Sequence, residues 1–380
     1  MITCVKQMTV CLIGDPPSER FHSMEIYEKA LAEGLKGIMG IELRRRQWPV
    51  YLGVPQNKYL ATAQIYWNRH WFYPSRLKIP AADVYHILDQ TYAHLLARLP
   101  PGKTVITCHD LMPLMVDGYG NSWGGKLSQA SFRSSVAYLH RARYILADSE
   151  ATKRALIDIL NINERNVNVV PLGVEDMFCP CDPTMDHPME DEVRYILQVG
   201  ATAEPYKNTM NILRSFSLLL KNIGGQIKLL KVGKAYTKEQ QRYIEEEGLA
   251  PHILHLGFVE RKELPIVYRR SAVLLMPSLY EGFGMPLLEA MACGIPVVTA
   301  DRGSIREVAG EAALYVDPMD PGDIAHGLVK VLSDNTLRQE LIARGHSNAK
   351  KYTWQRTARE TFTVYKKQTI PSDVRNLRHI

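Results

Sequence analysis

Two glutamates separated by a glycine turn and the start of a helix are the residues best placed to do chemistry. Glu281 and Glu289 lie in the stretch SLYEGFGMPLLEAMACGIPVVTAD, residues 278–301, which follows an apolar strand-like run at 272–277. A glycine turn that enters a helix presents free backbone N–H groups and the positive end of the helix dipole. This arrangement suits a phosphate or diphosphate. Pro286 fits the first helical position, where no N–H is needed.

The two carboxylates need a separate explanation, because a glutamate in the turn would by itself favour a cation over a phosphate. Glu281 is expected at the edge of the turn, and Glu289 about one turn inside the helix. A ligand that carries both phosphate and hydroxyl groups uses both features, since carboxylates accept hydrogen bonds from hydroxyls. The alternative is an ordinary helix-cap loop with two solvated glutamates.

A histidine at the end of a buried strand is the second candidate. His109 ends the run TVITCH and is followed by Asp110, where a loop begins. Polar residues at the carboxyl ends of parallel strands are where ligand sites are built. The alternative is a histidine that caps its own loop through Asp110. His86, His94 and His140 lie within helix or strand segments and are expected to be structural or on the surface.

The elements around these residues alternate between strand and helix, twice over. Strands are expected at 9–14, 84–88, 104–108, 144–147 and 167–171, and then at 195–200, 227–233, 253–259, 272–277, 296–300 and 314–316. Helices are expected at 24–35, 151–160, 210–220, 238–247 and 286–292. Strands separated by helices of this length predict an α/β fold of two doubly wound, Rossmann-like domains with parallel sheets.

The boundary between the two domains is expected near 176–192, where DMFCPCDPTMDHPMEDE has three prolines and no apolar periodicity. We therefore expect an N-terminal, acceptor-side domain at 1–180 and a C-terminal, nucleotide-sugar-binding domain at 190–352. Residues 353–380 are expected to contain a helix, with Thr353 as N-cap, that packs back toward the first domain.

Composition sets the broad class. The chain has 380 residues, 46% hydrophobic and 23% charged, with a net charge of +6. No apolar run approaches the ~20 residues of a membrane-spanning helix, and no secretion signal is evident, which favours the cytoplasm. Cys179 and Cys181 form the one close cysteine pair, without a second pair at matching spacing, so no metal site is expected.

One segment combines basic and aromatic residues. Between Lys36 and Lys78 there are eight Lys or Arg against a single acid, Glu42, with several Trp, Tyr and Phe interleaved. This pattern is compatible with a membrane surface or a phosphorylated acceptor, although a solvated strand and loop with inward-packed aromatics explains it too. Nucleic acid is not expected as a partner, because the chain as a whole is only mildly basic.

At this point a resemblance becomes specific. The segment at 278–301 is similar to the E-x7-E donor motif of the large retaining glycosyltransferase family 4, glycosyl transferases group 1, of the GT-B fold. The similarity continues through GSIREVAGEAALYVDPMDP at 303–321 and includes VGATAEPYKN at 199–208. In the first domain TCHDLMP, ADSEATKRAL and VVPLGVE also fit, so the likeness spans about residues 80–365.

The resemblance implies a role for each matching residue, in two domains that face a central cleft. Glu281 would hydrogen-bond the donor sugar, Lys207 would neutralise the leaving diphosphate, and His109 would reach the sugar ring from the first domain. Ribose hydroxyls would bind Glu289. The remaining donor contacts are the amides of Gly282, Phe283, Gly284 and Met285, and the base site at Phe258 and Val259.

Two departures from the family pattern bear on activity. The arginine that usually accompanies the lysine is absent, because Ala201 and Tyr206 occupy its two customary positions. A second cation helps a phosphate clamp, and its loss is expected to cost ~2–3 kcal/mol. Lys234 and Arg261, each just past a neighbouring strand, are the candidates to replace it. The usual glycine-rich first loop is also missing after Gly14, so acceptor contacts cannot be transferred from the family.

The function expected from all this is retaining, metal-independent transfer of a hexose-type sugar from a UDP- or GDP-sugar. The acceptor would be a glycan, a lipid-linked molecule or a small molecule. No cofactor beyond the nucleotide-sugar co-substrate is expected, and the protein would be cytoplasmic, with possible peripheral contact to the inner membrane face through 36–78. The alternatives are a nucleotide-sugar-binding regulatory protein with little turnover, and a phosphorylase or epimerase of the same fold.

Overall fold

The computed structural model describes residues 7–16, 22–46, 48, 64–116, 123–180, 193–223 and 226–369. The chain divides into two compact units. Unit 1 comprises residues 1–173 together with 354–380, and unit 2 comprises 174–353. Among the described helices, none is both long enough and apolar enough to cross a membrane.

Unit 1 is built on a six-stranded parallel sheet with the order β2-β1-β3-β4-β5-β6. Its strands are β1 (Met8–Ile13), β2 (Ile41–Arg45), β3 (Val84–Ile87), β4 (Thr104–Cys108), β5 (Tyr144–Ala147) and β6 (Val167–Val169). Its α-helices are α1 (His22–Lys36), α3 (Tyr73–Arg76), α4 (Met112–Met115), α5 (Trp123–Val136), α6 (Glu150–Leu160) and α14 (Trp354–Thr369).

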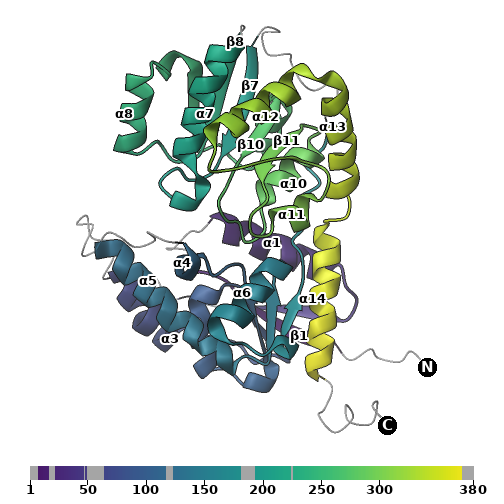
Figure 1. Cartoon of the computed structure of the whole chain (residues 1–380). Helices are drawn as coiled ribbons and strands as arrows, with labels where there is room; N and C mark the ends of the chain where they lie inside the picture. The colour runs from purple at the N-terminus through teal and green to yellow at the C-terminus, as the bar shows by residue number, and fades with distance from the viewer. Residues whose placement is uncertain are drawn as a thin grey trace. The chain divides into compact units, whose positions relative to one another are not determined.

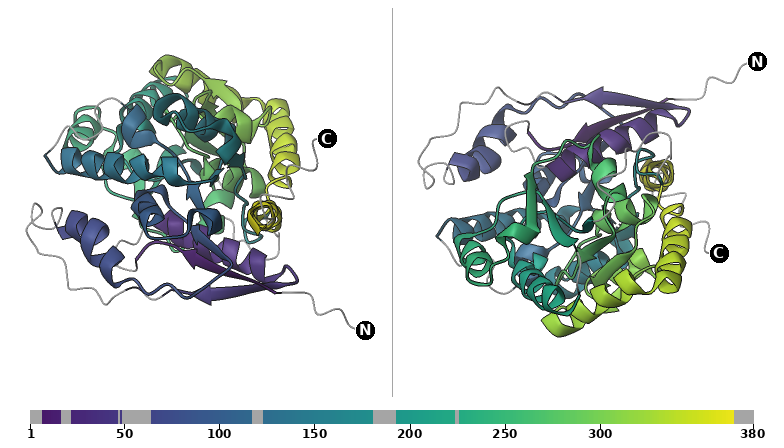
Figure 2. Two further views of the ribbon diagram at one scale, coloured as in Figure 1. Left: turned by 90° about the horizontal axis from the view of Figure 1, so that it is seen from below. Right: turned by 90° about the horizontal axis from the view of Figure 1, so that it is seen from above.

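The last helix of the chain packs against the first. Gly34 of α1 allows this approach, because a Cβ there would lie 2.7 Å from the Cβ of Ala358 in α14. Figure 2 shows the yellow helix nearly end-on beside the purple one. The helix begins directly after Thr353. On the sheet itself, Cys11 and Cys108 are buried free thiols in the core, as their apolar surroundings predict.

Unit 2 has the strand order β12-β11-β10-β7-β8-β9, again all parallel. Its strands are β7 (Val193–Val199), β8 (Gln226–Val232), β9 (Ile253–Gly257), β10 (Val273–Met276), β11 (Val297–Ala300) and β12 (Leu314–Val316). Its α-helices are α7 (Thr209–Asn222), α8 (Lys238–Glu246), α9 (Leu264–Arg269), α10 (Met285–Ala292), α11 (Ile305–Ala309), α12 (Pro321–Ser333) and α13 (Asn335–Ala349).

Helices cover both faces of this second sheet (Figure 1). Two successive residues of β10 show it: Val273 packs with α7 and α12, whereas Leu274 packs with α9, α10 and α11. Because successive side chains of a strand point to opposite faces, an all-apolar strand such as β10 must be covered on both sides. The predicted doubly wound α/β fold is therefore confirmed.

The differences from the sequence-based expectations include one strand, the start of one helix and the domain boundary. Strand β2 was not predicted, since its arginines obscure the alternation of Ile41 and Leu43 at the sheet edge. Helix α10 begins at Met285 instead of Pro286. The boundary lies at 173/174, and Phe178, in the stretch interpreted as linker, is buried in the core of unit 2. Most of that stretch, 181–192 with Cys181, lies outside the described residues.

Candidate active site

The strand order of unit 2 decides which loops meet. Strands β7 and β10 are neighbours, and the chain proceeds from them in opposite directions across the sheet. Ligands of doubly wound sheets bind at such a switch point, at the carboxyl ends of the strands. The loop after β7 carries Lys207, and the loop after β10 carries Glu281. The two residues that the sequence singles out most strongly are thus brought together by topology.

Lys207 and Glu281 form a direct ion pair. Lys207 Nζ lies 2.8 Å from Glu281 Oε1, and the side chains are 18% and 9% exposed. Ser278 Oγ donates to the same oxygen at 2.6 Å. No described residue donates to Glu281 Oε2. The pair therefore offers one carboxylate oxygen as an acceptor and one ammonium that an anion could share.

The loop that holds Glu281 is fixed by its neighbours. Asn208, in a left-handed conformation with φ 57°, donates through Nδ2 to the carbonyls of Pro277 and Pro318 at 3.0 and 2.6 Å. Gly303 packs so closely that a Cβ would lie 2.6 Å from the carbonyl oxygen of Glu281, and its φ of +60° favours glycine. These contacts fix the backbone around Glu281. The sequence-based prediction included neither Asn208 nor Ser278 as a site residue.

The start of α10 has the geometry of an anion site. Gly284 caps the helix in a left-handed conformation, with φ 97°. The amides of Phe283, Gly284 and Met285 donate to no described group, as expected for the first turn of a helix. Gly282 lies between them and Glu281. Backbone N–H groups and an exposed helix dipole thus lie next to the Lys207–Glu281 pair.

Glu289 lies deeper, in a buried ionic cluster. Its Oε1 accepts from Arg261 at 2.6 Å and its Oε2 from the hydroxyl of Tyr268 at 2.6 Å. Arg261 also pairs with Glu175 through two nitrogens and lies 4.5 Å from the ring centroid of Phe178. Glu289 is only 2% exposed. Both of its oxygens are engaged by protein groups, although each carboxylate oxygen can accept a second hydrogen bond.

Arg261 is consequently not available as a replacement for the missing clamp arginine, because it is committed to two carboxylates. Lys234, the other candidate, is exposed after β8. Ala201 and Tyr206 lie in the loop after β7, where the Tyr206 ring centroid is 5.3 Å from Lys207 Nζ. After β9, Phe258 is 71% exposed and Val259 packs against the core of unit 2.

In unit 1, His109 joins the carboxyl ends of three neighbouring strands. Its Nδ1 lies 2.6 Å from Asp148 Oδ2, which follows β5, and its Nε2 lies 2.8 Å from the carbonyl of Leu88, which follows β3. A carboxylate and a carbonyl only accept, so both ring nitrogens donate and the imidazole is protonated. Burial opposes this charge, but Asp148 outweighs it and raises the pKa of His109 to about 9.

The partner of His109 is therefore Asp148 and not Asp110, which instead accepts from the amide of Met112 at the start of α4. His109 itself is 8% exposed. Asp148 belongs to ADSEATKRAL, a stretch already notable in the sequence, but its pairing with His109 follows from the adjacency of β4 and β5. His86 is fully buried between Tyr365 and Thr107, consistent with the structural role expected for it.

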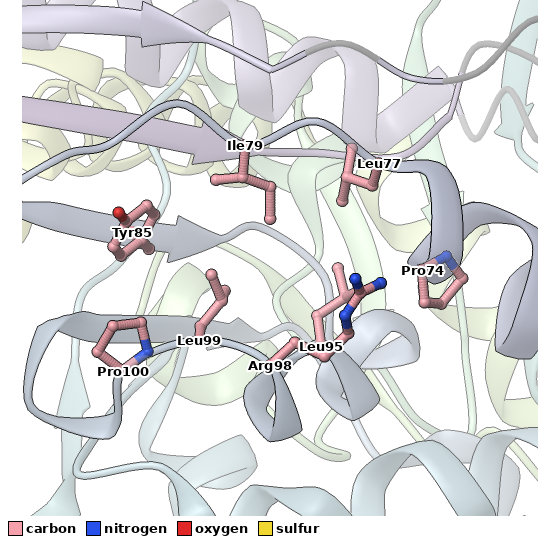
Figure 3. Close-up of a pocket in the computed structure, with 8 residues that line it drawn as sticks. All are labelled: Pro74, Leu77, Ile79, Tyr85, Leu95, Arg98, Leu99 and Pro100. Atoms are coloured by element: carbon pink, nitrogen blue, oxygen red, sulfur yellow. The ribbon is translucent and has the colours of Figure 1, made fainter.

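A pocket of about 270 Å³ lies elsewhere in unit 1 (Figure 3). It is lined by Pro74, Leu77, Ile79, Tyr85, Leu95, Arg98, Leu99 and Pro100. Leu99 and Pro100 precede β4, so the pocket is at the amino end of that strand, away from the edge where ligand sites form.

Comparison with known proteins agrees with this geometry. Residues 186–348 match the family model described as Glycosyl transferases group 1, and residues 28–177 match the model described as Glycosyltransferase Family 4. The O-antigen chain mannosyltransferase B of Escherichia coli is 29% identical over 74% of each chain. A serotype-specific mannosyltransferase, WbdA, of the same organism is 28% identical over 68% of this chain but only 32% of its own length.

Solved structures show the same fold. Sucrose-phosphate synthase from Thermosynechococcus elongatus has a TM-score of 0.71 at 18% identity, covering 95% of this chain and 99% of its own. Anabaena HepE, solved in complex with UDP and glucose, has a TM-score of 0.67 at 16% identity, covering 95% and 100%. The chain belongs to glycosyltransferase family 4, has the GT-B fold, and is a glycosyltransferase.

Proposed function

We propose that this glycosyltransferase moves a hexose-type sugar from a UDP- or GDP-sugar to a glycan, lipid-linked or small-molecule acceptor, with retention of configuration and without a metal ion. The observation that carries the proposal is the Lys207–Glu281 pair beside the free amides of α10. Mannosyltransferases among the relatives and the UDP and UDP-glucose complexes of HepE support a nucleotide-sugar donor.

In this proposal the donor's diphosphate lies at the start of α10. Negative charge grows on the diphosphate as the glycosidic bond breaks, and preorganised donors aimed at that charge lower the barrier. Lys207 and the amides of Phe283, Gly284 and Met285 supply these donors, and Gly282 lets the backbone approach. Glu281 Oε2 accepts a hydrogen bond from the sugar.

The nucleoside end of the donor would extend past α10. Glu289 accepts from the ribose hydroxyls, using the second acceptor capacity of its oxygens, while Phe258 and Val259 contact the base. Phe258 is 71% exposed, and aromatic rings stack on nucleobases. Stacking would cover this side chain on binding.

For His109 we propose contact with the sugar. Because both ring N–H groups already have acceptors, this contact requires one of them to be shared with, or exchanged for, a sugar oxygen. His109→Gln should then lower kcat at least tenfold while leaving the Kd of the nucleoside diphosphate unchanged. If His109→Gln and wild type have equal kcat and equal thermal stability, the proposed contact of His109 with the sugar is refuted.

The stereochemistry and the metal requirement are tested by one product analysis. The protein is incubated with UDP- and GDP-hexoses and a mixed acceptor set in EDTA, and the new linkage is assigned by proton NMR. We expect the product to keep the donor's anomeric configuration, with rates equal in EDTA and Mg²⁺. Among the described residues, no group of three His, Cys, Asp or Glu could hold a metal ion. An inverted product, or activity that only Mg²⁺ restores, would contradict the proposal.

We also propose that unit 1 contacts an anionic membrane surface through the segment 36–78. Its described part divides in two: Phe72 and Tyr73 are buried, whereas Trp67 and Trp71 are 55% and 68% exposed. Arg76 and Lys78 are exposed nearby. Exposed tryptophans beside basic residues are typical of proteins that lie on membrane surfaces.

Sedimentation with phosphatidylglycerol liposomes tests this contact. The double variant Trp67→Ser/Trp71→Ser should lose most of the bound fraction, and 0.5 M NaCl should lower binding because it screens the basic residues. Met319→Ser, at a residue of unit 2 that is 63% exposed, is the matched control and should bind as the wild type does. Equal sedimentation of the tryptophan variant would refute the membrane contact.

A further inference from the structure

A fully buried lysine lies beneath the loop that carries Lys207. Lys231, the penultimate residue of β8, has an exposed fraction of 0%. Its Nζ donates to the carbonyls of Gly200 and Val232, both at 2.5 Å. Neither partner is charged, and Lys231 makes no ion pair with a described carboxylate. A buried ammonium with only neutral acceptors is costly, because desolvation of a cation is normally offset by an anion.

The position of this ammonium relates it to the donor site. Gly200, the first residue after β7, takes the hydrogen bond from Lys231, and a Cβ at Gly200 would lie 3.8 Å from Lys207 Cε. Gly233, after β8, completes the cluster: a Cβ there would lie 2.6 Å from the Gly200 carbonyl oxygen and 3.3 Å from Lys231 Nζ. Two positive-φ glycine turns thus allow Lys231 to approach the loop closely.

We propose that Lys231 is the second positive charge of the diphosphate site, a positioning residue that acts from beneath the Gly200 turn. It binds the Gly200 carbonyl, whose negative end would otherwise repel a phosphate, and it adds its field to that of Lys207. It supplies the cation that Ala201 and Tyr206 lack. This inference rests on the proposed nucleotide-sugar function and names a residue that the sequence motifs do not mark.

The charges around the cluster support a ligand anion. Burial, and then the nearby Lys207 ammonium, lower the pKa of Lys231 to about 8. Three further titratable groups follow β8 or belong to β9: Lys234, Tyr236 and His255, whose Nε2 hydrogen-bonds the Gly233 carbonyl at 2.8 Å. Glu281 is the remaining one, and it is paired with Lys207. A bound diphosphate would favour the charged lysine, so binding should raise its pKa and take up protons.

Calorimetry of UDP and GDP binding at pH 8.5, in Tris and in EPPS, measures this uptake. With a pKa of about 8 in the free protein, full protonation on binding at pH 8.5 corresponds to an uptake of about 0.8 of a proton. Wild type should show this uptake with whichever diphosphate binds. Lys231→Met should lose it and bind that diphosphate about tenfold more weakly, whereas uridine or guanosine binding should not change. Lys228→Met, on the same strand, should behave as wild type.

The outcomes separate the two proposals. If wild type binds neither diphosphate, the nucleotide-sugar function fails and this inference fails with it. If wild type binds one of them without proton uptake, or if Lys231→Met shows the same uptake and affinity, only the role of Lys231 is refuted. The wild-type uptake does not depend on any variant folding. Any contribution from His109, whose pKa is about 9, would be equal in wild type and Lys231→Met.

Discussion

Lys207→Ala is expected to lower kcat by about 10²–10³-fold, with a smaller effect on the Kd of the donor. Lys207 carries the one described ammonium that both pairs with Glu281 and lies beside the free amides of α10. Its attraction to the diphosphate grows as the leaving group gains charge, so the transition state loses more than the ground state does. Single-turnover kinetics with saturating donor measures this step directly.

Lys330→Ala is the matched control for this substitution. Lys330 is exposed near the end of α12, which lies toward the amino ends of the strands and not toward their carboxyl ends. The kcat of Lys330→Ala should stay within twofold of the wild-type value. The variants Glu281→Ala and Lys207→Ala/Glu281→Ala complete a cycle, and because the two side chains act as a pair, their effects on kcat should not add. A Lys207→Ala enzyme with wild-type kcat would contradict the assignment of Lys207.

Glu289→Ala is expected to reduce the free energy of unfolding of unit 2 by about 3 kcal/mol, in addition to weakening the donor site. The substitution removes a buried carboxylate that is 2% exposed. It leaves the Tyr268 hydroxyl without its acceptor and removes one of the two carboxylates that offset the charge of Arg261. Urea unfolding followed by circular dichroism gives the change, because the five tryptophans of the chain all lie in unit 1 and do not report on unit 2.

Glu246→Ala, at an exposed glutamate of α8, serves as the control and should change the unfolding free energy by less than ~0.5 kcal/mol. Glu289→Gln separates the hydrogen bond to Tyr268 from the ion pair with Arg261, since glutamine keeps an acceptor but carries no charge. An unchanged urea midpoint for Glu289→Ala would mean that the ionic cluster does not stabilise unit 2.

Much of the fold was predictable because its signals are local. β4, β5 and β12 have the predicted bounds, since buried parallel strands are short apolar runs bounded by polar residues. β2 was missed because an edge strand is half exposed, and its Glu42 and Arg44 hide the apolar alternation. Phe178 was read as linker because a single aromatic carries no periodicity, and only tertiary packing reveals its place.

The candidate site was predictable only in part. Lys207 and Glu281 came from family motifs, but their direct contact depends on β7 and β10 being neighbours, which the order of elements along the chain does not state. Ser278 carries no sequence signal of its own beside Glu281. Lys231 does carry a sequence signal, because a lysine inside an apolar strand, two residues before a glycine, is unusual in a buried position.

The central claim is that the Lys207–Glu281 pair forms the donor site of a nucleotide-sugar-dependent transferase. Release of nucleoside diphosphate from a panel of UDP- and GDP-sugars, without added metal, tests it most directly in wild type and Glu281→Ala. We predict that wild type cleaves at least one donor, even if slowly and to water, and that Glu281→Ala releases none above background. Equal release by both proteins, or donor binding without release by wild type across a broad acceptor set, would contradict the claim.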